Sequence, residues 1–285
     1  MHTTLPPPKQ ALPERTYLEN QFVYLVLSQR ARGLSVGINL NPDKQCNFDC
    51  VYCEVDRSCA NIAARMDIPR LAAELEDMLI VIQGDRVREL PGFASVPPEL
   101  LKLKEVALSG DGEPTMCPEF EEVIHTVLHV RGKELVPFCK VVLITNGSGL
   151  HLPGVRRGLQ LLTSKDEVWV KLDTGREQDF QRVNSPKDVS LEHILKNILE
   201  LGRQRPIVIQ SLFPAVNGQG PGENEIAEYI QRLKDLKSAG TRISLVQIYS
   251  VHRTPVRKEC THLPLRELAA IARRVRRAGL PAEVF

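Results

Sequence analysis

The sequence predicts an α/β protein in which βα units repeat around a parallel sheet. Apolar, β-branched runs of about four to eight residues alternate with longer segments of helical period, the pattern typical of such units. The composition agrees, because 42% hydrophobic and 25% charged residues are usual for a globular protein with a sizeable core. The formal net charge of +2 is too small for a chain whose whole surface binds nucleic acid, so only a local basic patch could do so.

The expected elements form six βα units along the chain. A β-rich run over residues 22–27 precedes them. The expected strands are residues 36–40, 104–109, 140–145, 166–172, 206–212 and 242–249. The expected helices are residues 68–83, 118–130, 154–163, 190–203, 223–239 and 264–278. Ser190 is a typical helix cap, while Gly240 and Gly279 each follow a basic final turn, where helices end.

The remaining segments bear on domain organisation and location. Residues 1–20 contain four prolines among polar residues and are expected to form a mobile amino-terminal arm. Residues 84–102 are a long connection and the expected place of an irregular insertion. No second domain is evident, so residues 21–285 are expected to form one domain. No window has the pattern of a signal peptide or a membrane span, which predicts a cytoplasmic protein without a membrane partner.

Residues that carry chemistry gather where the expected strands end. Residues 46–53 follow the first strand, residues 110–113 the second and Asn146 the third, while Lys171 and Asp173 end the fourth. In parallel α/β folds the carboxyl ends of the strands share one edge, and the functional site lies there. We therefore expect these four loops to converge on one rim.

Cys46, Cys50 and Cys53 are spaced closely enough for one loop to wrap a single metal centre. Seven cysteines in a chain without a signal peptide favour metal ligands and core thiols over a disulfide framework. Three thiolates on a cubane [4Fe-4S] cluster would leave one iron open to bind another molecule. The alternative is a zinc site completed by Cys59 or a distant histidine, because both side chains bind zinc tetrahedrally.

The spacing Cys-x3-Cys-x2-Cys, with the aromatic Tyr52 before the last cysteine, resembles the signature of the radical S-adenosylmethionine (SAM) superfamily. Residues 108–115 are similar to the glycine and glutamate motif of that family. Residues 36–42 resemble the lead-in of the subgroup that contains the wyosine-type tRNA-modifying synthases. Further similar segments are residues 143–147, 170–174, 180–186, 209–213 and 246–249, so the resemblance runs from about residue 30 to 280.

The resemblance implies a partial (β/α)6 TIM-like barrel with helices outside. It also implies that Cys46, Cys50 and Cys53 bind a [4Fe-4S] cluster whose open iron binds SAM. One electron, from a donor such as a flavodoxin or ferredoxin, would cleave SAM to a 5′-deoxyadenosyl radical that takes a hydrogen atom from the substrate. The substrate is left open and is a small molecule, a peptide or a nucleotide.

The loops would then bind SAM. Gly110, Asp111 and Gly112 would let the backbone approach SAM closely, and Glu113 is placed to bind its ammonium group. The alternative for this segment is a plain strand-to-helix turn. Asn146 is expected to hydrogen-bond SAM, or alternatively to form a simple Asn-Gly turn.

Six more side chains are expected near SAM: Tyr52, Lys171, Asp173, Gln210, Gln247 and Tyr249. Tyr52 is expected beside adenine, and Tyr249 is expected to stack or hydrogen-bond at the rim, with core packing as the alternative for both. Lys171 would face the SAM carboxylate or an anionic substrate group, unless it forms a buried ion pair with Asp173. The two glutamines lie in apolar strands and need a polar partner, either in SAM or within the protein.

Other segments bear on alternative functions. Residues 273–277 are basic and could contact phosphate, so tRNA base modification is one alternative, although a solvated helix face is the simpler interpretation. The wyosine-type enzymes carry additional cysteines in an amino-terminal region, and this chain has none before Cys46. Residues 252–262 hold two histidines and a cysteine and are expected to be a solvated segment that faces the substrate, with a metal site as the alternative. Cys139 is expected to be a core thiol. A zinc-stabilised binding protein without turnover is the alternative from another class.

Overall fold

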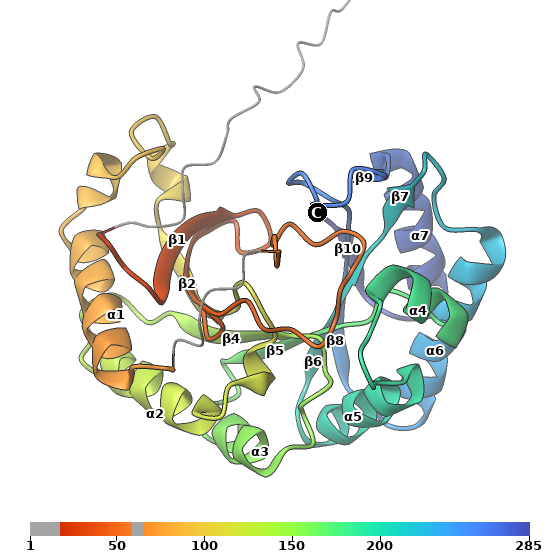
Figure 1. Cartoon of the computed structure of the whole chain (residues 1–285), viewed down its shortest axis with the longest axis horizontal. Helices are drawn as coiled ribbons and strands as arrows, with labels where there is room; N and C mark the ends of the chain where they lie inside the picture. Colours follow the sequence, from red (N-terminus) through yellow and green to blue (C-terminus); the bar gives the residue numbers. More distant parts are fainter. Residues whose placement is uncertain (1–17, 59–64) are drawn as a thin grey trace, which may run out of the picture.

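A computed structural model describes residues 18–58 and 65–285. Its centre is a sheet of eight strands, in the order β1-β2-β3-β4-β5-β6-β8-β10, that curls into a partial barrel (Figure 1). The strands are β1 (Val23–Ser28), β2 (Gly33–Ile38), β3 (Leu103–Leu108), β4 (Lys140–Thr145), β5 (Glu167–Lys171), β6 (Ile207–Leu212), β8 (Ile243–Tyr249) and β10 (Ala282–Val284). All neighbours from β2 to β10 are parallel, and β1 is antiparallel to β2 at the edge. Two short strands, β7 (Pro214–Val216) and β9 (Cys260–His262), pair separately.

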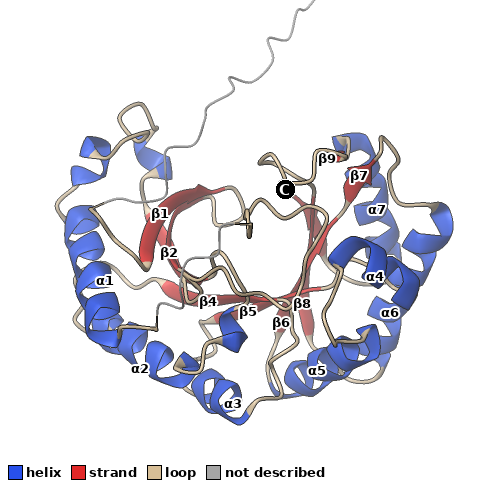
Figure 2. Ribbon diagram, viewed as in Figure 1, coloured by secondary structure: helices blue, strands red, loops and turns tan. Residues whose placement is uncertain are grey.

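Helices cover the outer face of the sheet (Figure 2). They are α1 (Ile68–Gln83), α2 (Phe120–Arg131), α3 (Pro153–Gln160), α4 (Glu177–Asn184), α5 (Leu191–Gln204), α6 (Glu223–Ser238) and α7 (Leu265–Arg277). Each crossover between parallel strands contains at least one of them, so the carboxyl ends of the strands all point to the same rim. The Ser190 hydroxyl accepts a hydrogen bond from the amide of His193 (3.2 Å) and so caps α5, as predicted.

Alternate residues along a strand face the helices or the barrel interior. On β6, Ile207 and Ile209 belong to the large core under the helices, whereas Val208 packs against Trp169 in a second, smaller cluster. Gln210 is the next position on the side of Val208 and is 2% exposed. Because side chains alternate along the strand, the interior side of β6 carries an apolar residue deeper in the barrel and a polar residue nearer the rim.

The predicted α/β class and partial barrel are confirmed. The six predicted strands and six predicted helices are present, with ends that move by at most three residues, and the β-rich run is β1. Gly240 and Gly279 have φ of 99° and 80°, the left-handed conformation expected after a helix. The expected insertion holds two short 3-10 helices, η1 (Arg86–Glu89) and η2 (Pro98–Leu100).

Among the described residues, one α-helix and three strands were not predicted from the sequence, namely α4, β7, β9 and β10. Helix α4 has eight residues, of which only Phe180 and Val183 are buried apolar side chains, too few to give a helical period. The predicted mobile arm falls largely on residues 1–17, outside the described residues. Within the described part of the chain, no helix is both long and apolar enough to cross a membrane.

Candidate functional site

The segment after β2 crosses the rim of the barrel and carries the three cysteines of the motif. This segment, residues 39–58, is called the cysteine loop; its cysteines are free, partly buried thiols. The loops after β3, β4 and β5 each hydrogen-bond to it, through Glu113, Asn146 and Asp173 respectively. The expected convergence of four loops on one rim is therefore observed.

The end of α4 holds one side of the cysteine loop. The Val51 amide donates to the Val183 carbonyl (2.9 Å), and the Asp49 amide donates to the Asn184 carbonyl (3.2 Å). These contacts are backbone hydrogen bonds between segments more than 130 positions apart in the sequence. The loop has no regular structure of its own, so its shape depends on the folded barrel.

The segment after β8 holds the other side of the cysteine loop. The Val256 amide donates to the Cys53 carbonyl (2.9 Å), and Arg253 pairs with Glu54 (2.7 Å). Residues 252–262, expected to face the substrate, thus pack on the cysteine loop as well.

Each thiol sulfur accepts a hydrogen bond from a different neighbour. The Phe48 amide donates to Cys46 Sγ (3.4 Å), and Asn184 Nδ2 to Cys50 Sγ (3.6 Å). Arg57 Nη1 donates to Cys53 Sγ (3.0 Å). Donors of this kind stabilise a thiolate, which is the form that binds metal.

Burial keeps two of the thiols protonated in the apoprotein. It raises the pKa of Cys46 to about 11 and that of Cys50 to about 12, with a further rise at Cys50 from the charge of Asp173. A metal centre would have to displace these protons. Within the described residues, no three His, Cys, Asp or Glu side chains converge as they would on one metal ion. The thiols of a cubane bind three different irons and need not converge on one atom.

Close approach explains the glycines of the loop after β3. A Cβ on Gly110 would lie 2.4 Å from Asn39 Oδ1, and a Cβ on Gly112 would lie 1.9 Å from the Gln45 carbonyl oxygen. Between them, Asp111 Oδ2 accepts a hydrogen bond from Asn39 Nδ2 (2.8 Å). The loop thus packs directly on the cysteine loop, which is a structural reason for glycine at both positions.

Glu113 ties the loop after β3 to the end of β4. Its Oε1 accepts from the Thr115 amide (3.0 Å) and from the Thr145 hydroxyl (2.5 Å), and its Oε2 accepts from the Asn146 amide (2.7 Å). Burial raises its pKa, while these donors oppose the rise. Glu113 also begins the short helix η3 (Pro114–Met116), the turn named as the alternative. Its contact with a SAM ammonium stays a prediction.

Asn146 forms the Asn-Gly turn that was its alternative. Its Oδ1 accepts from the Ser148 amide (2.9 Å), and Gly147 has a φ of 84°. Its Nδ2 donates to Asn47 Oδ1 (2.8 Å), so the turn also binds the cysteine loop. A role in binding SAM stays a prediction.

A buried carboxylate, Asp173, is the centre of a polar network beside Cys50. It accepts hydrogen bonds from the Tyr52 hydroxyl, from Asn184 Nδ2 (2.7 Å) and from the Leu212 amide (2.8 Å). Its side chain is fully buried, and Lys171 Nζ lies 3.6 Å from Oδ1. The ion pair considered for Lys171 is therefore present, and Tyr52 connects it to the cysteine loop.

The network continues across the barrel interior through Tyr249. Lys171 Nζ donates to the Tyr249 hydroxyl (2.9 Å), which donates to Gln210 Oε1 (3.1 Å). Gln210 Nε2 donates to Gln247 Oε1 (3.1 Å), so each glutamine has a partner within the protein. Burial alone would lower the pKa of Lys171, but Asp173 and Tyr249 outweigh it and raise the pKa above its usual value. These contacts favour the charged form of Lys171 inside the barrel.

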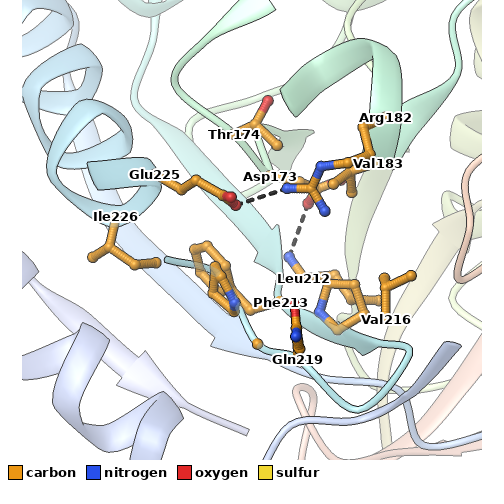
Figure 3. Close-up of a pocket in the computed structure, with 13 residues that line it drawn as sticks. Asp173, Thr174, Arg182, Val183, Leu212, Phe213, Val216, Gln219, Glu225 and Ile226 are labelled. Atoms are coloured by element: carbon orange, nitrogen blue, oxygen red, sulfur yellow. Dashed lines mark hydrogen bonds and ion pairs between the residues drawn. The ribbon is translucent and has the colours of Figure 1, made fainter. Parts of the chain in front are cut away.

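A solvent-open crevice adjoins this network (Figure 3). Its lining residues are Asp173, Thr174, Arg182, Val183, Leu212, Phe213, Pro214, Val216, Gln219, Gly220, Pro221, Glu225 and Ile226. Arg182 pairs with Glu225 (2.8 Å) across it. The Thr174 hydroxyl is buried and has no hydrogen-bond partner among the described residues. The crevice shares Asp173 with the network and is therefore part of the same rim.

Two residues of the site, Asn184 and Arg57, were missed in the sequence. Asn184 lies in a segment that resembles the family, residues 180–186, but no local pattern assigns it a partner. Arg57 follows Cys53 by four positions, and only the folded loop brings it back to the sulfur. Of the remaining cysteines, Cys139 is a buried core thiol as expected, and Cys59 lies outside the described residues.

The chain is similar in sequence to several known proteins. No family model matches the chain. A UPF0026 protein of Helicobacter pylori is 28% identical over 233 residues, which cover 81% of this chain and 67% of that protein. A UPF0026 protein of Synechocystis sp. is 29% identical over 178 residues, which cover 62% of this chain and 57% of that protein.

Several solved structures share the fold of this chain. A radical SAM methyltransferase from Sphaerobacter thermophilus superposes with a TM-score of 0.60 at 13% identity, covering 92% of this chain and 68% of that chain. SuiB of Streptococcus suis bound to S-adenosylmethionine gives 0.58 at 13% identity, covering 90% and 52%. TYW1 with a lysine-pyruvate adduct gives 0.57 at 16% identity, covering 87% and 74%. The chain therefore has the fold of the radical SAM enzymes, as its cysteine motif and the loop motifs around it predict.

Proposed function

We propose that the protein is a radical SAM enzyme that binds one [4Fe-4S] cluster through Cys46, Cys50 and Cys53. The observation that carries the proposal is the convergence of the cysteine loop with the loops after β3, β4 and β5 on one barrel rim. The donor set fits the group, because three free thiols on one loop each have a neighbouring N–H donor. When bound, the cluster with SAM would supply a 5′-deoxyadenosyl radical after reduction by one electron.

The chain's own residues would position the reactants. Tyr52 and Asn184 hold Asp173 against the cysteine loop, which fixes the rim next to Cys50. Lys171 stays cationic and lies in the barrel below, where it can attract the carboxylate of SAM or an anionic group of the substrate. The packed loop after β3, with Gly110 at its start, supports the cysteine loop from the other side.

The other candidate residues lie along the same rim and in the barrel interior below it. In the loop after β3, Asp111 and Gly112 would approach SAM closely and Glu113 would bind its ammonium group, while Asn146 in the loop after β4 would hydrogen-bond SAM. Farther inside, Gln210, Gln247 and Tyr249 form the wall beyond Lys171.

The lysine chemistry seen in one structure of similar fold is not assigned to Lys171. The TYW1 structure contains a lysine-pyruvate adduct, whose formation needs a neutral amine. In this chain Lys171 Nζ lies 3.6 Å from Asp173 Oδ1 and donates to the Tyr249 hydroxyl (2.9 Å), and these contacts favour its charged form. We therefore do not assign Lys171 as a nucleophile, and the substrate is left open among small molecules, peptides and nucleotides.

The test is metal analysis followed by SAM cleavage. After anaerobic purification and reconstitution, we expect about four irons per chain and 5′-deoxyadenosine on addition of SAM and dithionite. Zinc at one equivalent without cleavage would contradict the proposal and favour the zinc-stabilised binding protein. Salt-sensitive binding of tRNA in a gel-shift titration would favour tRNA as the substrate.

A further inference from the structure

Arg57 connects the two loops that frame the cysteines. Its Nε donates to the Lys44 carbonyl (3.1 Å), and its Nη2 donates to the Asp111 carbonyl (3.0 Å). Lys44 belongs to the cysteine loop and Asp111 to the loop after β3. One guanidinium therefore bridges both loops, a contact that the planar fork of arginine makes well and a lysine cannot copy.

The third nitrogen of the same guanidinium, Nη1, donates to a sulfur. Arg57 Nη1 donates to Cys53 Sγ at 3.0 Å. The carboxylates closest in sequence have other partners: Glu54 pairs with Arg253 (2.7 Å), and the Asp56 carboxylate accepts from the Ser58 amide (2.9 Å). Within the described residues no ion pair includes Arg57, and Cys53 Sγ is the side-chain atom to which its guanidinium donates; its other acceptors are backbone carbonyls.

We propose that Arg57 is a positioning residue that also raises the reduction potential of the cluster. The inference rests on the proposed function, since it needs a cluster on Cys53. One electron from an external reductant adds one negative charge to the cluster, and no bond within the protein forms or breaks. A neighbouring cation and an N–H donor to a ligand sulfur stabilise that added charge more than the oxidised state. Arg57 therefore makes the one-electron reduction that precedes SAM cleavage easier.

The experiment compares anaerobically reconstituted wild type with Arg57→Gln, Arg57→Lys and Arg253→Gln. The reduction potential is measured by titration with dithionite, followed by electron paramagnetic resonance. Arg253→Gln is the charge control: it also removes one positive charge beside the cysteine loop, but Arg253 contacts a carboxylate instead of a sulfur, so its shift measures the loss of charge without the loss of an N–H donor to sulfur. We expect Arg57→Gln to shift the potential to more negative values than wild type and the control, with Arg57→Lys in between.

Each outcome of this experiment supports or contradicts one of the two proposals. A wild-type protein that takes up no cluster contradicts the proposed function itself. A clustered wild type and a clustered Arg57→Gln with equal potentials overturn the role of Arg57 and leave the proposed function intact. If Arg57→Gln melts like wild type but loses its iron while Arg253→Gln keeps it, the positioning role is supported. Lower melting temperatures together with lost iron in both Arg57 variants would make Arg57 a structural residue and overturn the inference.

Discussion

Asp173→Asn is expected to destabilise the protein, because Asp173 is the centre of the polar network. Each oxygen of Asp173 now faces donors: Tyr52 and Asn184 on Oδ2, and Leu212 and Lys171 on Oδ1. An amide offers one accepting oxygen, so its NH2 group would face donors in either orientation. The change also leaves Lys171 without its carboxylate, which for a buried pair costs about 3–5 kcal/mol.

The expected loss is at the lower end of that range. Lys171 is 17% exposed, so water can take up part of its charge, and we expect a fall of about 3 kcal/mol in the free energy of unfolding. For a chain of this size, this corresponds to a melting temperature lower by roughly 6–12 °C. The assay is thermal and urea unfolding followed by circular dichroism. Asp235→Asn is the control, because its pair with Arg232 is half exposed and is worth at most about 1 kcal/mol.

A double variant isolates the charge. Lys171→Met combined with Asp173→Asn removes the unpaired cation and is expected to regain about 1 kcal/mol or more relative to Asp173→Asn. A single Asp173→Asn variant as stable as Asp235→Asn would refute the central place of Asp173. A double variant no more stable than the single one would show that the unpaired charge is not the cause.

Three further changes test the site and the fold. Cys50→Ala is expected to lose most iron and the absorbance near 400 nm, roughly where thiolate-to-iron charge transfer absorbs, and unchanged iron would contradict the ligand assignment. Gly112→Ala is expected to reduce iron uptake because its Cβ would lie 1.9 Å from a carbonyl of the cysteine loop, whereas Gly154→Ala, with 3.8 Å of clearance, should match wild type. Burial raises the pKa of Asp166, but the Arg131 side chain and backbone amides outweigh it and lower the pKa below 3.8. The stabilisation by Asp166 is therefore present above pH 3.8 and lost as the pH falls through its folded pKa, so Asp166→Asn should be least stable relative to wild type at neutral pH and converge with it in acid.

The barrel was predictable because its signals are local and repeated. Apolar, β-branched runs that alternate with segments of helical period predict six βα units, and parallel strands then bring their carboxyl ends together whatever the side chains are. That topology alone predicts that Lys171 and Asp173 lie near the cysteines. The same local signals are absent in α4, where polar residues dominate and the helix is short.

The contacts within the site were less predictable, because they depend on side-chain geometry across the rim. Gln210 and Gln247 were known to need partners, yet the sequence could not choose between a ligand and each other. Asn184 is an ordinary polar residue until the cysteine loop reaches it, and then it contacts Asp173, Tyr52 and Cys50 at once.

The contacts that hold the cysteine loop explain why the spacing of the three cysteines is necessary but not sufficient for a metal site. The loop contains no helix or strand, and its backbone instead bonds to Val183 and Asn184 on one side and Val256 on the other. Those partners lie far along the chain and meet only when β5, β6 and β8 are paired in the barrel. The thiols therefore gain fixed positions from the fold, whereas the same three cysteines in an unfolded chain would carry the entropic cost of ordering the whole loop. Cluster assembly should accordingly follow barrel folding.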